Sequence, residues 1–427
     1  MNDTVTPGYR RYLLGLMLVC LIVNFIDRQL PAILLPEIKK DLDLSDTQLG
    51  FITGLAFAIF YSTVGILVGR IGDTFSRRNV LATCIGLWSL ATAASGAANN
   101  FVQMACARFA VGFGEAGLTP IAHSLISDLY PPGKRASAMG IYTAGVPLGL
   151  LIAFLGGAWI TDVFGWRMAF FALGLPGIIL ALVVFSTVKE TPRGGVDGLQ
   201  DQGAPPPLWE VFKTLIAIPS FRHCCLATSF TGMVYTCIQT WGPSFLSRSF
   251  DMTLAEIGTW LAPTVGLGGM LGTMLGGIIA DKLSIKDKRW MGRVPGTAVA
   301  VGTLVGMFAF LTHTSWLSIA LMAVPLILYP VHLPIYGTIL QGLASVRMRS
   351  SFPAISLFIA GMIGLGIGPQ MVGIASDIVR PWAGEESLRY ALALIVPFFG
   401  FWAALHFYIG GKHIAADFDK ARERGSS

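Results

Sequence analysis

The sequence predicts an all-α membrane protein with twelve transmembrane helices in two pseudo-symmetric bundles of six. Three observations lead to this fold class. Only 13% of the 427 residues are charged and 54% are hydrophobic, whereas a soluble domain averages about 25% charged residues. Apolar stretches long enough to cross a bilayer as a helix recur along the chain. A polar segment divides them into two sets of six, and residue spacings recur between the sets.

The expected spans follow one another with short connections. Their length argues against a soluble protein, and their continuous apolar character argues against a transmembrane barrel, in which apolar residues alternate. Gly-rich runs such as "GLGGMLGTMLGG" allow membrane helices to pack closely. The spans are 12–35, 47–69, 79–98, 101–127, 136–161, 167–188, 223–246, 255–280, 294–313, 315–343, 352–376 and 387–409.

The distribution of Lys and Arg orients the spans. With the N-terminus inside, 22 of these residues fall on the inner side and 6 on the outer side, while Arg28 and Arg108 lie within spans. Basic residues concentrate on the cytoplasmic side of membrane proteins, so both termini are expected in the cytoplasm. The net charge of +6 therefore reflects topology, because no clustered basic site supports nucleic-acid binding. The first ten residues lack the form of a cleaved signal peptide, so the first span is expected to remain.

The polar segment 189–222 is expected to be a cytoplasmic linker between an N-terminal bundle, 1–188, and a C-terminal bundle with a short tail, 223–427. Its Gly, Pro and Asp content is typical of a flexible connection. Residues 208–218 have apolar side chains near helical spacing and could lie flat on the inner membrane surface.

Pairs of residues recur at fixed intervals in the two halves. Such parallel repeats are typical of transporters that bind substrate near the bilayer midplane. Two pairs differ by 208 positions and two by 214: Gly69 with Gly277, Asp73 with Asp281, Pro120 with Pro334, and Arg135 with Arg349.

Cofactor sites are not expected. No Walker-type phosphate loop occurs, so ATP is not the expected energy source. The six cysteines all fall within expected spans, where they are best interpreted as small packing residues rather than disulfides or zinc ligands. They are Cys20, Cys84, Cys106, Cys224, Cys225 and Cys237.

Three motifs resemble signatures of the major facilitator superfamily, and the resemblance covers nearly the whole chain. They are "GRIGDTFSRRNVL" after span 2, "RFAVGFG" in span 4 and "GVPLG" in span 5. The first departs from the family pattern at Thr74 and Ser76. Within the superfamily, "NFIDRQ" and "GFGEAGLTPIAHSLISDLYPPGKR" look most like the spinster-like branch, whose members move lysophospholipids or sphingoid phosphates. Organic-anion and sugar-acid symporters carry a similar Asp-Arg pair and a similar "GEAG". The resemblance also implies a bacterial inner-membrane location.

The first motif implies a cytoplasmic gate formed by Gly69, Asp73, Arg77 and Arg78. Asp73 lies near the inner end of span 2, where a carboxylate can meet a helix N-terminus or the nearby arginines. Such a cluster can latch the two halves on the cytoplasmic side. A positive-inside anchor would explain the arginines, but not the repeated Gly-x-x-x-Asp spacing.

The span-5 motif contains Gly145, Pro147 and Gly149. Proline removes a helix hydrogen bond and glycine lets helices approach closely. Bending and close packing are both expected here, and the sequence does not separate them.

Four charged residues lie in the middle of expected spans: Asp27, Arg28, Arg108 and Glu115. Charges at this depth are costly and usually face a cavity or a partner. Arg108 and Glu115 are seven positions apart on one helix face, while Asp27 and Arg28 point about 100° apart. We expect Arg28 to pair with Glu115 in one state, and Asp27 to reach Arg108 or a span packed behind it.

The resemblance places spans 1, 4, 7 and 10 around the central cavity. Asp27 and Glu115 are then proton-coupling candidates, with Asp27 favoured, and Arg28, Arg108 and Asn24 are substrate-binding candidates. Burial favours the neutral acid and a neighbouring arginine favours the charged one, so proton affinity should depend on the state. A purely structural ion network is the alternative.

The second half offers almost no charge at mid-depth. Its cavity-facing candidates are aromatic or polar, with Tyr235 and Tyr329 assigned to substrate; the others are Gln239, Trp241, His332 and Tyr336. A cavity with charged residues from the first half and apolar residues from the second half would suit an amphipathic anion. His123 and His332 are interpreted as packing or hydrogen-bonded residues rather than proton relays.

The sequence therefore predicts a proton-coupled secondary active transporter that works by alternating access as a monomer, without a cofactor. The expected substrate is a lysophospholipid or a sphingoid-phosphate-like lipid, and the alternative is an organic anion or sugar acid. An enzyme would need a nucleophile, base or metal cluster, which the motifs do not supply. A channel would need a continuous polar pore, whereas charge here is concentrated in one place.

Overall fold

The structure is a computed structural model that describes residues 6–190, 208–343 and 351–426. Over these ranges the chain is helical, with short turns and no strand. Contacts within the chain divide it into two compact units, described in turn below. Unit 1 comprises Met1–Leu44, Ala56–Asp201 and Thr253–Ala262, and unit 2 comprises Ser45–Leu55, Gln202–Met252 and Pro263–Ser427.

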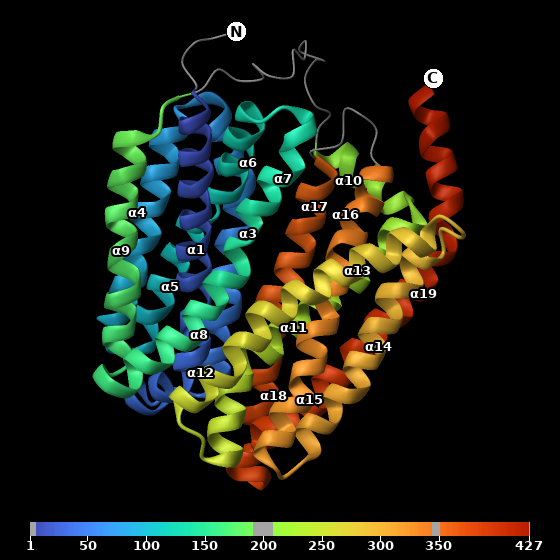
Figure 1. The fold of residues 1–427 in the computed structure, drawn as a ribbon. Coiled ribbons are helices and arrows are strands. Elements are labelled where there is room, and N and C mark those ends of the chain that lie inside the picture. The colour runs from blue at the N-terminus through green and yellow to red at the C-terminus, as the bar shows by residue number, and fades with distance from the viewer. Residues whose placement is uncertain (1–5, 191–207, 344–350, 427) are drawn as a thin grey trace. The chain divides into compact units, whose positions relative to one another are not determined.

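Unit 1 is built around α1, which packs against α8 and α9, while α4 packs against α5 and α9. Figure 1 shows α4 and α9 side by side along their length. The helices of this unit are α1 (Pro7–Leu42), α3 (Ala56–Thr74), α4 (Arg77–Gly96), α5 (Phe101–Glu115), α6 (Leu118–Leu129), α7 (Pro132–Thr143), α8 (Gly145–Phe164), α9 (Trp166–Thr187) and α12 (Leu254–Pro263).

Unit 2 is organised around α19, which packs along α11 and α14. Its α-helices are α2 (Asp46–Gly50), α10 (Leu208–Ala217), α11 (Pro219–Phe250), α13 (Gly269–Ser284), α14 (Trp290–Leu311), α15 (Ser315–Leu328), α16 (His332–Leu343), α17 (Ser351–Ala360), α18 (Gly368–Ala383) and α19 (Ser387–Ser426). Short π-helical or 3₁₀ segments join several of them: η1 (Phe51–Leu55), η2 (Thr264–Gly268), η3 (Tyr329–Val331), η5 (Gly361–Ile367) and η6 (Gly384–Glu386).

Each of the twelve expected spans coincides with one helix or with a run of consecutive helices. Nine stretches of the described chain are long and apolar enough to cross a membrane, and the last, Ile355–Ala421, covers two of the expected spans. The two remaining spans are α5 with α6, which are individually short, and α11, which carries hydroxyl and amide side chains through its middle. The predicted fold class is confirmed.

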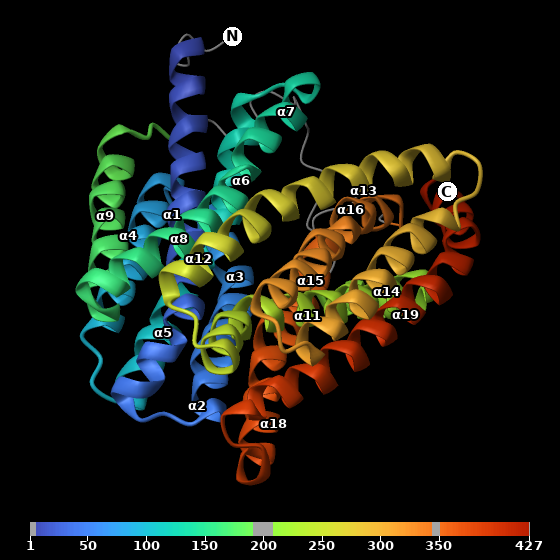
Figure 2. The ribbon, with the colours of Figure 1, turned by 60° about the horizontal axis from the view of Figure 1, so that its bottom comes forward.

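Two short segments belong to a different unit from the helix that directly follows them in the chain. The segment α2 with η1 belongs to unit 2, although α3 continues in unit 1, and α12 belongs to unit 1, although α13 continues in unit 2. Figure 2 shows α2 beside α18 and α12 beside α8. The contact-based units thus differ from the division by chain order, 1–188 and 223–427, which stays a prediction.

Glycine permits both of these contacts. A Cβ at Gly50 would lie 2.6 Å from the Pro369 carbonyl oxygen, and one at Gly258 would lie 2.5 Å from the Phe154 carbonyl oxygen. A side chain at either position would therefore force the helices apart.

The expected helix in the linker is present as α10, next to residues 191–207, which lie outside the described part of the chain. Val211 and Leu215 are fully buried in a cluster with Phe221 and Phe352 of unit 2, while Trp209 is 62% exposed. The apolar face of α10 thus packs on protein. Its position on a membrane surface stays a prediction.

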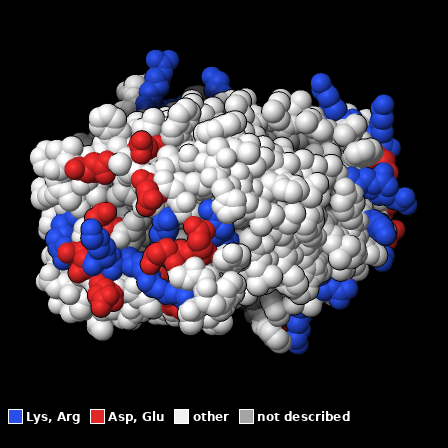
Figure 3. Space-filling view, turned by 90° about the horizontal axis from the view of Figure 1, so that it is seen from below, with Lys and Arg blue, Asp and Glu red and all other residues white. Residues whose placement is uncertain are grey.

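Large apolar side chains cover much of the surface of the described helices. Figure 3 shows a broad uncharged area next to a patch in which acidic and basic side chains mix. Exposed apolar surface of this extent is matched by lipid rather than water. All six cysteines are free; five are buried and Cys106 is exposed.

Candidate substrate and proton site

The four charged residues expected at mid-depth come together in unit 1. The Arg28 Nε donates to Glu115 Oε2 at 2.9 Å, and Arg28 Nη2 lies 2.8 Å from the same oxygen. The Glu115 side chain is fully buried, whereas the Arg28 side chain keeps 14% exposure. The expected ion pair between spans 1 and 4 is confirmed, and Arg28 is its accessible member.

Three aromatic rings surround the Arg28 guanidinium. Its Cζ lies 4.8 Å from the ring centroid of Phe25, 5.0 Å from that of Phe57 and 4.4 Å from that of Tyr61. Asn24, one helical turn before Arg28, accepts a hydrogen bond from its Nη2 at 3.3 Å. Aromatic faces attract a cation, so this cage can hold Arg28 in place when its acidic partner changes.

The sequence reasoning missed the aromatic cage. Phe57 and Tyr61 are four residues apart on α3, so they share one helix face. This spacing was visible in the sequence, but it did not identify the residue that the face contacts.

Arg108 does not bind the Asp27 carboxylate. It is 1% exposed, and its guanidinium donates to the backbone carbonyls of Asp27 at 3.3 Å and Arg28 at 3.4 Å. In a helix the Asp27 carbonyl would accept from residue 31, which is Pro31 and has no N–H. Arg108 thus supplies a donor to a carbonyl that the helix leaves unpaired, and it ties α5 to α1.

The Asp27 side chain turns instead toward α4, behind α1. It is fully buried, and neither carboxyl oxygen accepts a hydrogen bond from the described residues. The Trp88 indole and the Thr92 hydroxyl, both likewise without a partner there, are the polar groups of α4 that face it. An ionised carboxylate without hydrogen bonds is costly to bury. Of the two expectations for Asp27, the span packed behind it is the one realised.

Glu115 lies at a break in span 4. The helix α5 ends at Glu115 and α6 begins at Leu118. Pro120 lacks the N–H that would bond to the carbonyl four residues earlier, so the helix cannot continue regularly through this point. Gly114 brings this turn close to α4, since a Cβ there would lie 2.8 Å from the Trp88 backbone nitrogen.

The span-5 motif shows both a break and close packing. The helices α7 and α8 separate at Ala144, just before Pro147, whose missing N–H leaves the preceding turn unpaired. Gly145 and Gly149 face α1: a Cβ would lie 3.0 Å from the Leu18 carbonyl oxygen or 2.7 Å from that of Ile22. This packing fixes the part of α1 that precedes Arg28.

The residues of the expected cytoplasmic gate divide into two groups. Gly69 and Asp73 belong to α3, but their side chains lie outside the described residues. Arg77 is 1% exposed and forms ion pairs with Asp128 of α6 and, at 3.0 Å, with Glu190 after α9. Arg77 therefore joins three elements of unit 1, and its role in gating stays a prediction.

Glu190 is a member of this cluster that the sequence reasoning missed. It accepts from Ser76 Oγ at 2.9 Å and from the Arg78 backbone N–H at 3.4 Å, in addition to Arg77. Partial burial raises the pKa of its carboxyl, but hydrogen bonds from Arg77 and Ser76 outweigh this and hold the pKa below its ordinary value. Arg78 itself bonds to Asn79 at 3.1 Å and lies over the Phe185 ring.

In unit 2 the two tyrosines assigned to substrate differ in exposure. Tyr235 is partly exposed on α11. Tyr329 is fully buried, and its hydroxyl lies 3.1 Å from that of Thr303. His332 is also buried, and its Nδ1 lies 2.6 Å from the Tyr329 carbonyl oxygen.

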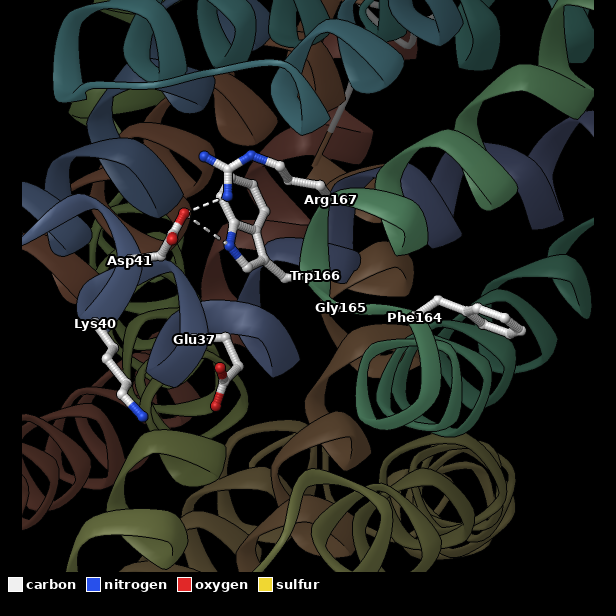
Figure 4. A pocket seen from close by; sticks show the side chains of 7 residues that line it. All are labelled: Glu37, Lys40, Asp41, Phe164, Gly165, Trp166 and Arg167. Carbon is white, nitrogen blue, oxygen red and sulfur yellow. Dashed lines mark hydrogen bonds and ion pairs between the residues drawn. The ribbon is translucent and has the colours of Figure 1, made fainter.

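A surface pocket in unit 1 lies apart from these residues. Its lining, drawn in Figure 4, comes from the end of α1, the end of α8 and the start of α9. Asp41 binds Arg167 and accepts from Trp166 Nε1 at 3.3 Å, and the Arg167 guanidinium stacks 4.2 Å from the Trp166 ring. None of the expected substrate residues lines this pocket, and the Asp41–Arg167 ion pair forms part of its wall.

Long apolar helices with a buried ion pair between spans 1 and 4 define a multi-pass membrane protein. The chain belongs to the Major Facilitator Superfamily, whose family model matches residues 17–369, and is therefore a transporter rather than an enzyme.

Several named relatives are similar to this chain over most of its length. The chain is 31% identical over 377 residues to an "MFS-type efflux pump" of Mycolicibacterium smegmatis, which covers 88% of this chain and 86% of that protein. It is 26% identical over 412 residues to "Protein spinster homolog 1" of Homo sapiens, covering 88% and 75%. A "Hexuronate transporter" of Bacillus subtilis is 27% identical over 390 residues, covering 87% and 89%.

Among solved structures, the chain resembles a bacterial homologue of the human lysosomal transporter spinster, in an inward-facing and unoccupied conformation. The TM-score is 0.85 at 27% identity, covering 97% of this chain and 99% of that one. The resemblance to the spinster type is confirmed.

Proposed function

We propose that this transporter is proton-coupled and moves an amphipathic anion by alternating access, with a lysophospholipid or sphingoid-phosphate-like lipid as the first substrate class. In this proposal the anionic headgroup binds Arg28. Headgroup binding is then coupled to protonation by three residues: Arg28, Glu115 and Asp27.

The contact between Arg28 and Glu115 is the observation that carries the proposal. Arg28 is the accessible cation, and its partner is a buried carboxylate that the headgroup would have to replace. Protonation of Glu115 removes the charge that holds Arg28 and frees the guanidinium for another anion. Its Oε1 has no hydrogen-bond partner among the described residues, so a proton can be added there without breaking a bond.

Asp27 is the second acid and our favoured coupling carboxylate. Its buried side chain points about 100° around α1 from that of Arg28 and faces Trp88 and Thr92. An acid at membrane depth that forms no ion pair among the described residues is suited to exchange protons when a conformational change brings water to it. Arg108 would position this stretch of α1 through the two backbone carbonyls.

The substrate class rests on two supports. The cage around Arg28 combines a cation with three aromatic rings, which suits a headgroup bearing an anion next to apolar groups. The sequence resembles the spinster-like branch, whose members move lysophospholipids or sphingoid phosphates, and a relative is named as a spinster homologue. We assign Tyr235 and Tyr329 of unit 2 to the apolar part of the substrate.

A second candidate function is symport of an organic anion or sugar acid. The hexuronate transporter of Bacillus subtilis, similar over 87% of this chain, favours it. Arg28 would bind the carboxylate of such a substrate in the same way, while the tyrosines would stack on the sugar ring.

Purified protein in proteoliposomes tests both candidates. Lysophospholipids, sphingoid phosphates and sugar acids would be offered with and without an inward proton gradient. We expect saturable accumulation of one anionic class that depends on the gradient and disappears with an uncharged analogue of the same tail. Equal uptake with and without the gradient would disprove proton coupling. We further propose a monomer in a bacterial inner membrane with both termini in the cytoplasm; protease protection of terminal tags tests the orientation.

A further inference from the structure

Two helix N-termini are completed by an aspartate from a distant helix. At the start of α2, the backbone N–H groups of Asp46 and Thr47 donate to the Asp377 carboxylate of α18, at 3.1 and 2.7 Å. At the start of α12, the N–H of Ala255 donates to Asp162 of α8 at 3.1 Å. These contacts are called the α2 cap and the α12 cap below.

Each cap satisfies donors that the local sequence leaves open. A capping box already occupies the first and fourth positions of each helix start, formed by Ser45 with Gln48 and by Thr253 with Glu256. The N–H groups between them have no partner within the helix. A carboxylate at this place also interacts favourably with the positive end of the helix dipole.

The two caps are related by the internal repeat. Thr47 and Ala255 differ by 208 positions, the interval already seen for the repeated Gly-x-x-x-Asp motifs. The capping boxes keep the same interval. Asp162 and Asp377 differ by 215, within one position of the interval that relates spans 4 and 10. The chain therefore builds the same contact twice, once in each unit.

Each cap joins the two halves of the sequence. In unit 2, Asp377 holds a segment that precedes α3 of unit 1, and in unit 1, Asp162 holds a segment that precedes α13 of unit 2. At or next to both boundaries the helix passes through a π-helical segment, η1 or η2. Such segments are weak points at which a helix can bend.

The α2 cap is reinforced and the α12 cap is not. Asp46 is fully buried, and Arg248 of α11 binds both of its carboxylate oxygens, at 2.7 and 2.8 Å. Ser376 donates to Asp46 at 2.6 Å. The equivalent of Asp46 by the repeat is Leu254, which has no side-chain charge.

From this geometry we propose that Asp377 and Asp162 are the latches of the predicted outer side. They hold the outer ends of spans 2 and 8 to the opposite half of the sequence, and both caps must open when the outer side opens. The α2 cap is the stronger latch. The inference rests on the alternating-access part of the proposed function.

Distances between spin labels on two predicted outer loops test the latches. Labels would be placed at Asn99→Cys and His313→Cys in a Cys106→Ser background, because Asn99 and His313 are exposed and Cys106 is the exposed native thiol. Measurements without substrate would compare the parent with Asp377→Asn and Asp162→Asn. Glu385→Gln is the matched control, since it neutralises an exposed carboxylate just beyond the end of α18 that pairs only loosely, at 3.5 Å, with Arg380.

We expect Asp377→Asn to raise the ratio of long to short outer distances roughly tenfold, the equivalent of about 1.4 kcal/mol, and Asp162→Asn to raise it about threefold. Glu385→Gln should leave the ratio unchanged. Two populations in the parent with no shift in either Asp variant, even if their melting temperatures fall, would show that the caps are only structural. A single distance in the parent at every pH and with every candidate substrate would instead refute alternating access, and the latches with it.

Discussion

The two halves of the chain use the same repeat positions for different chemistry. Asp43 and Asp251 both adopt a left-handed backbone conformation, and they end α1 and α11, the first transmembrane helix of each half. Their positions differ by 208. By this interval Asp27 corresponds to Tyr235. Spans 4 and 10 are related by an interval of 214 positions, and by this interval Glu115 corresponds to Tyr329.

This replacement has a simple physical meaning. An acid buried at membrane depth needs a cation or a proton, whereas a tyrosine hydroxyl needs only a hydrogen bond and stays uncharged. Glu115 is held by Arg28, and Tyr329 is held by the Thr303 hydroxyl. At these equivalent positions the first half therefore carries charged side chains and the second half carries uncharged aromatic ones.

The largest expected effect comes from removing the acids that distinguish the halves. Asp27→Asn and Glu115→Gln should each fold but lower gradient-driven accumulation in proteoliposomes by roughly a hundredfold, near the upper range of coupling between two sites. Exchange without a gradient should be retained, because it needs no net proton movement. The controls are Tyr235→Phe and Tyr329→Phe at the equivalent positions, which should keep accumulation. Normal accumulation in both acid variants would mean that the ionic cluster is structural.

Arg28→Ala tests the charged wall itself. Loss of a charge-assisted contact should weaken binding of the anionic substrate roughly thirtyfold, about 2 kcal/mol, while an uncharged analogue of the same tail should bind nearly as before. Arg28→Lys should be intermediate, because an ammonium does not reproduce the planar, forked guanidinium. Binding measured by scintillation proximity would decide this. Equal weakening of binding for charged and uncharged ligands would show that the headgroup does not bind Arg28.

The cytoplasmic cluster offers a third test. Asp73→Asn or Arg77→Ala should shift the population toward the inward-open state by roughly tenfold, since one charged contact is worth about 1.5 kcal/mol or more. Spin-label distances across the cytoplasmic face should lengthen. Arg78→Ala should have a smaller effect, because among the described residues its side chain bonds to neighbouring Asn79 and forms no ion pair. Unchanged distances in the Asp73 and Arg77 variants would argue against this gate.

The apolar half should respond to tail length. Tyr235→Ala should weaken binding more for long-tailed than for short-tailed ligands, because each buried methylene is worth about 0.8 kcal/mol. Tyr329→Ala should show the same trend with lower stability, since that side chain is fully buried; Tyr329→Phe separates the two effects by keeping the ring. A loss that does not vary with tail length would exclude tail contact.

The smallest effect concerns pH. The pKa of Glu190 is lowered by its hydrogen bonds in the folded state, so these contacts stabilise the protein at pH values above the ordinary glutamate pKa and are lost as the pH falls through the lowered value. Glu190→Gln should therefore lower the melting temperature at pH 7 by a small amount and have no effect at strongly acidic pH. A difference that grows on acidification would contradict this sign.

The sequence was most informative about charge and span order. Apolar length predicts the twelve spans, because every backbone group in a bilayer must be satisfied within its own helix or barrel. The interval of seven between Arg108 and Glu115, and the adjacency of Asp27 and Arg28, predicted which residues could meet. The pair between Arg28 and Glu115 follows from charge balance at a depth where an unpaired ion is costly.

Other partners depend on distances between helices, which residue spacing in the sequence does not give. Asp27 was expected to reach Arg108 or a span packed behind it, and the sequence left both open. In the structure Arg108 donates to the Asp27 carbonyl that Pro31 leaves open, and the Asp27 side chain turns to α4. The aromatic cage needs α3 to approach α1, and the Arg77 cluster needs Glu190, which is more than a hundred positions away.

The sequence by itself thus determined the number of spans, their repeat, and the set of buried charges, because those follow from solvation in lipid and from helix period. Only the tertiary structure showed which backbone carbonyls Arg108 binds. It also showed that Asp377 and Asp162 accept hydrogen bonds from the first backbone N–H groups of helices far away in the sequence. A capping box can be recognised from neighbouring residues in the sequence. The backbone N–H group that the box leaves unpaired is instead satisfied by whichever helix packs against it, and this packing exists only in the folded chain.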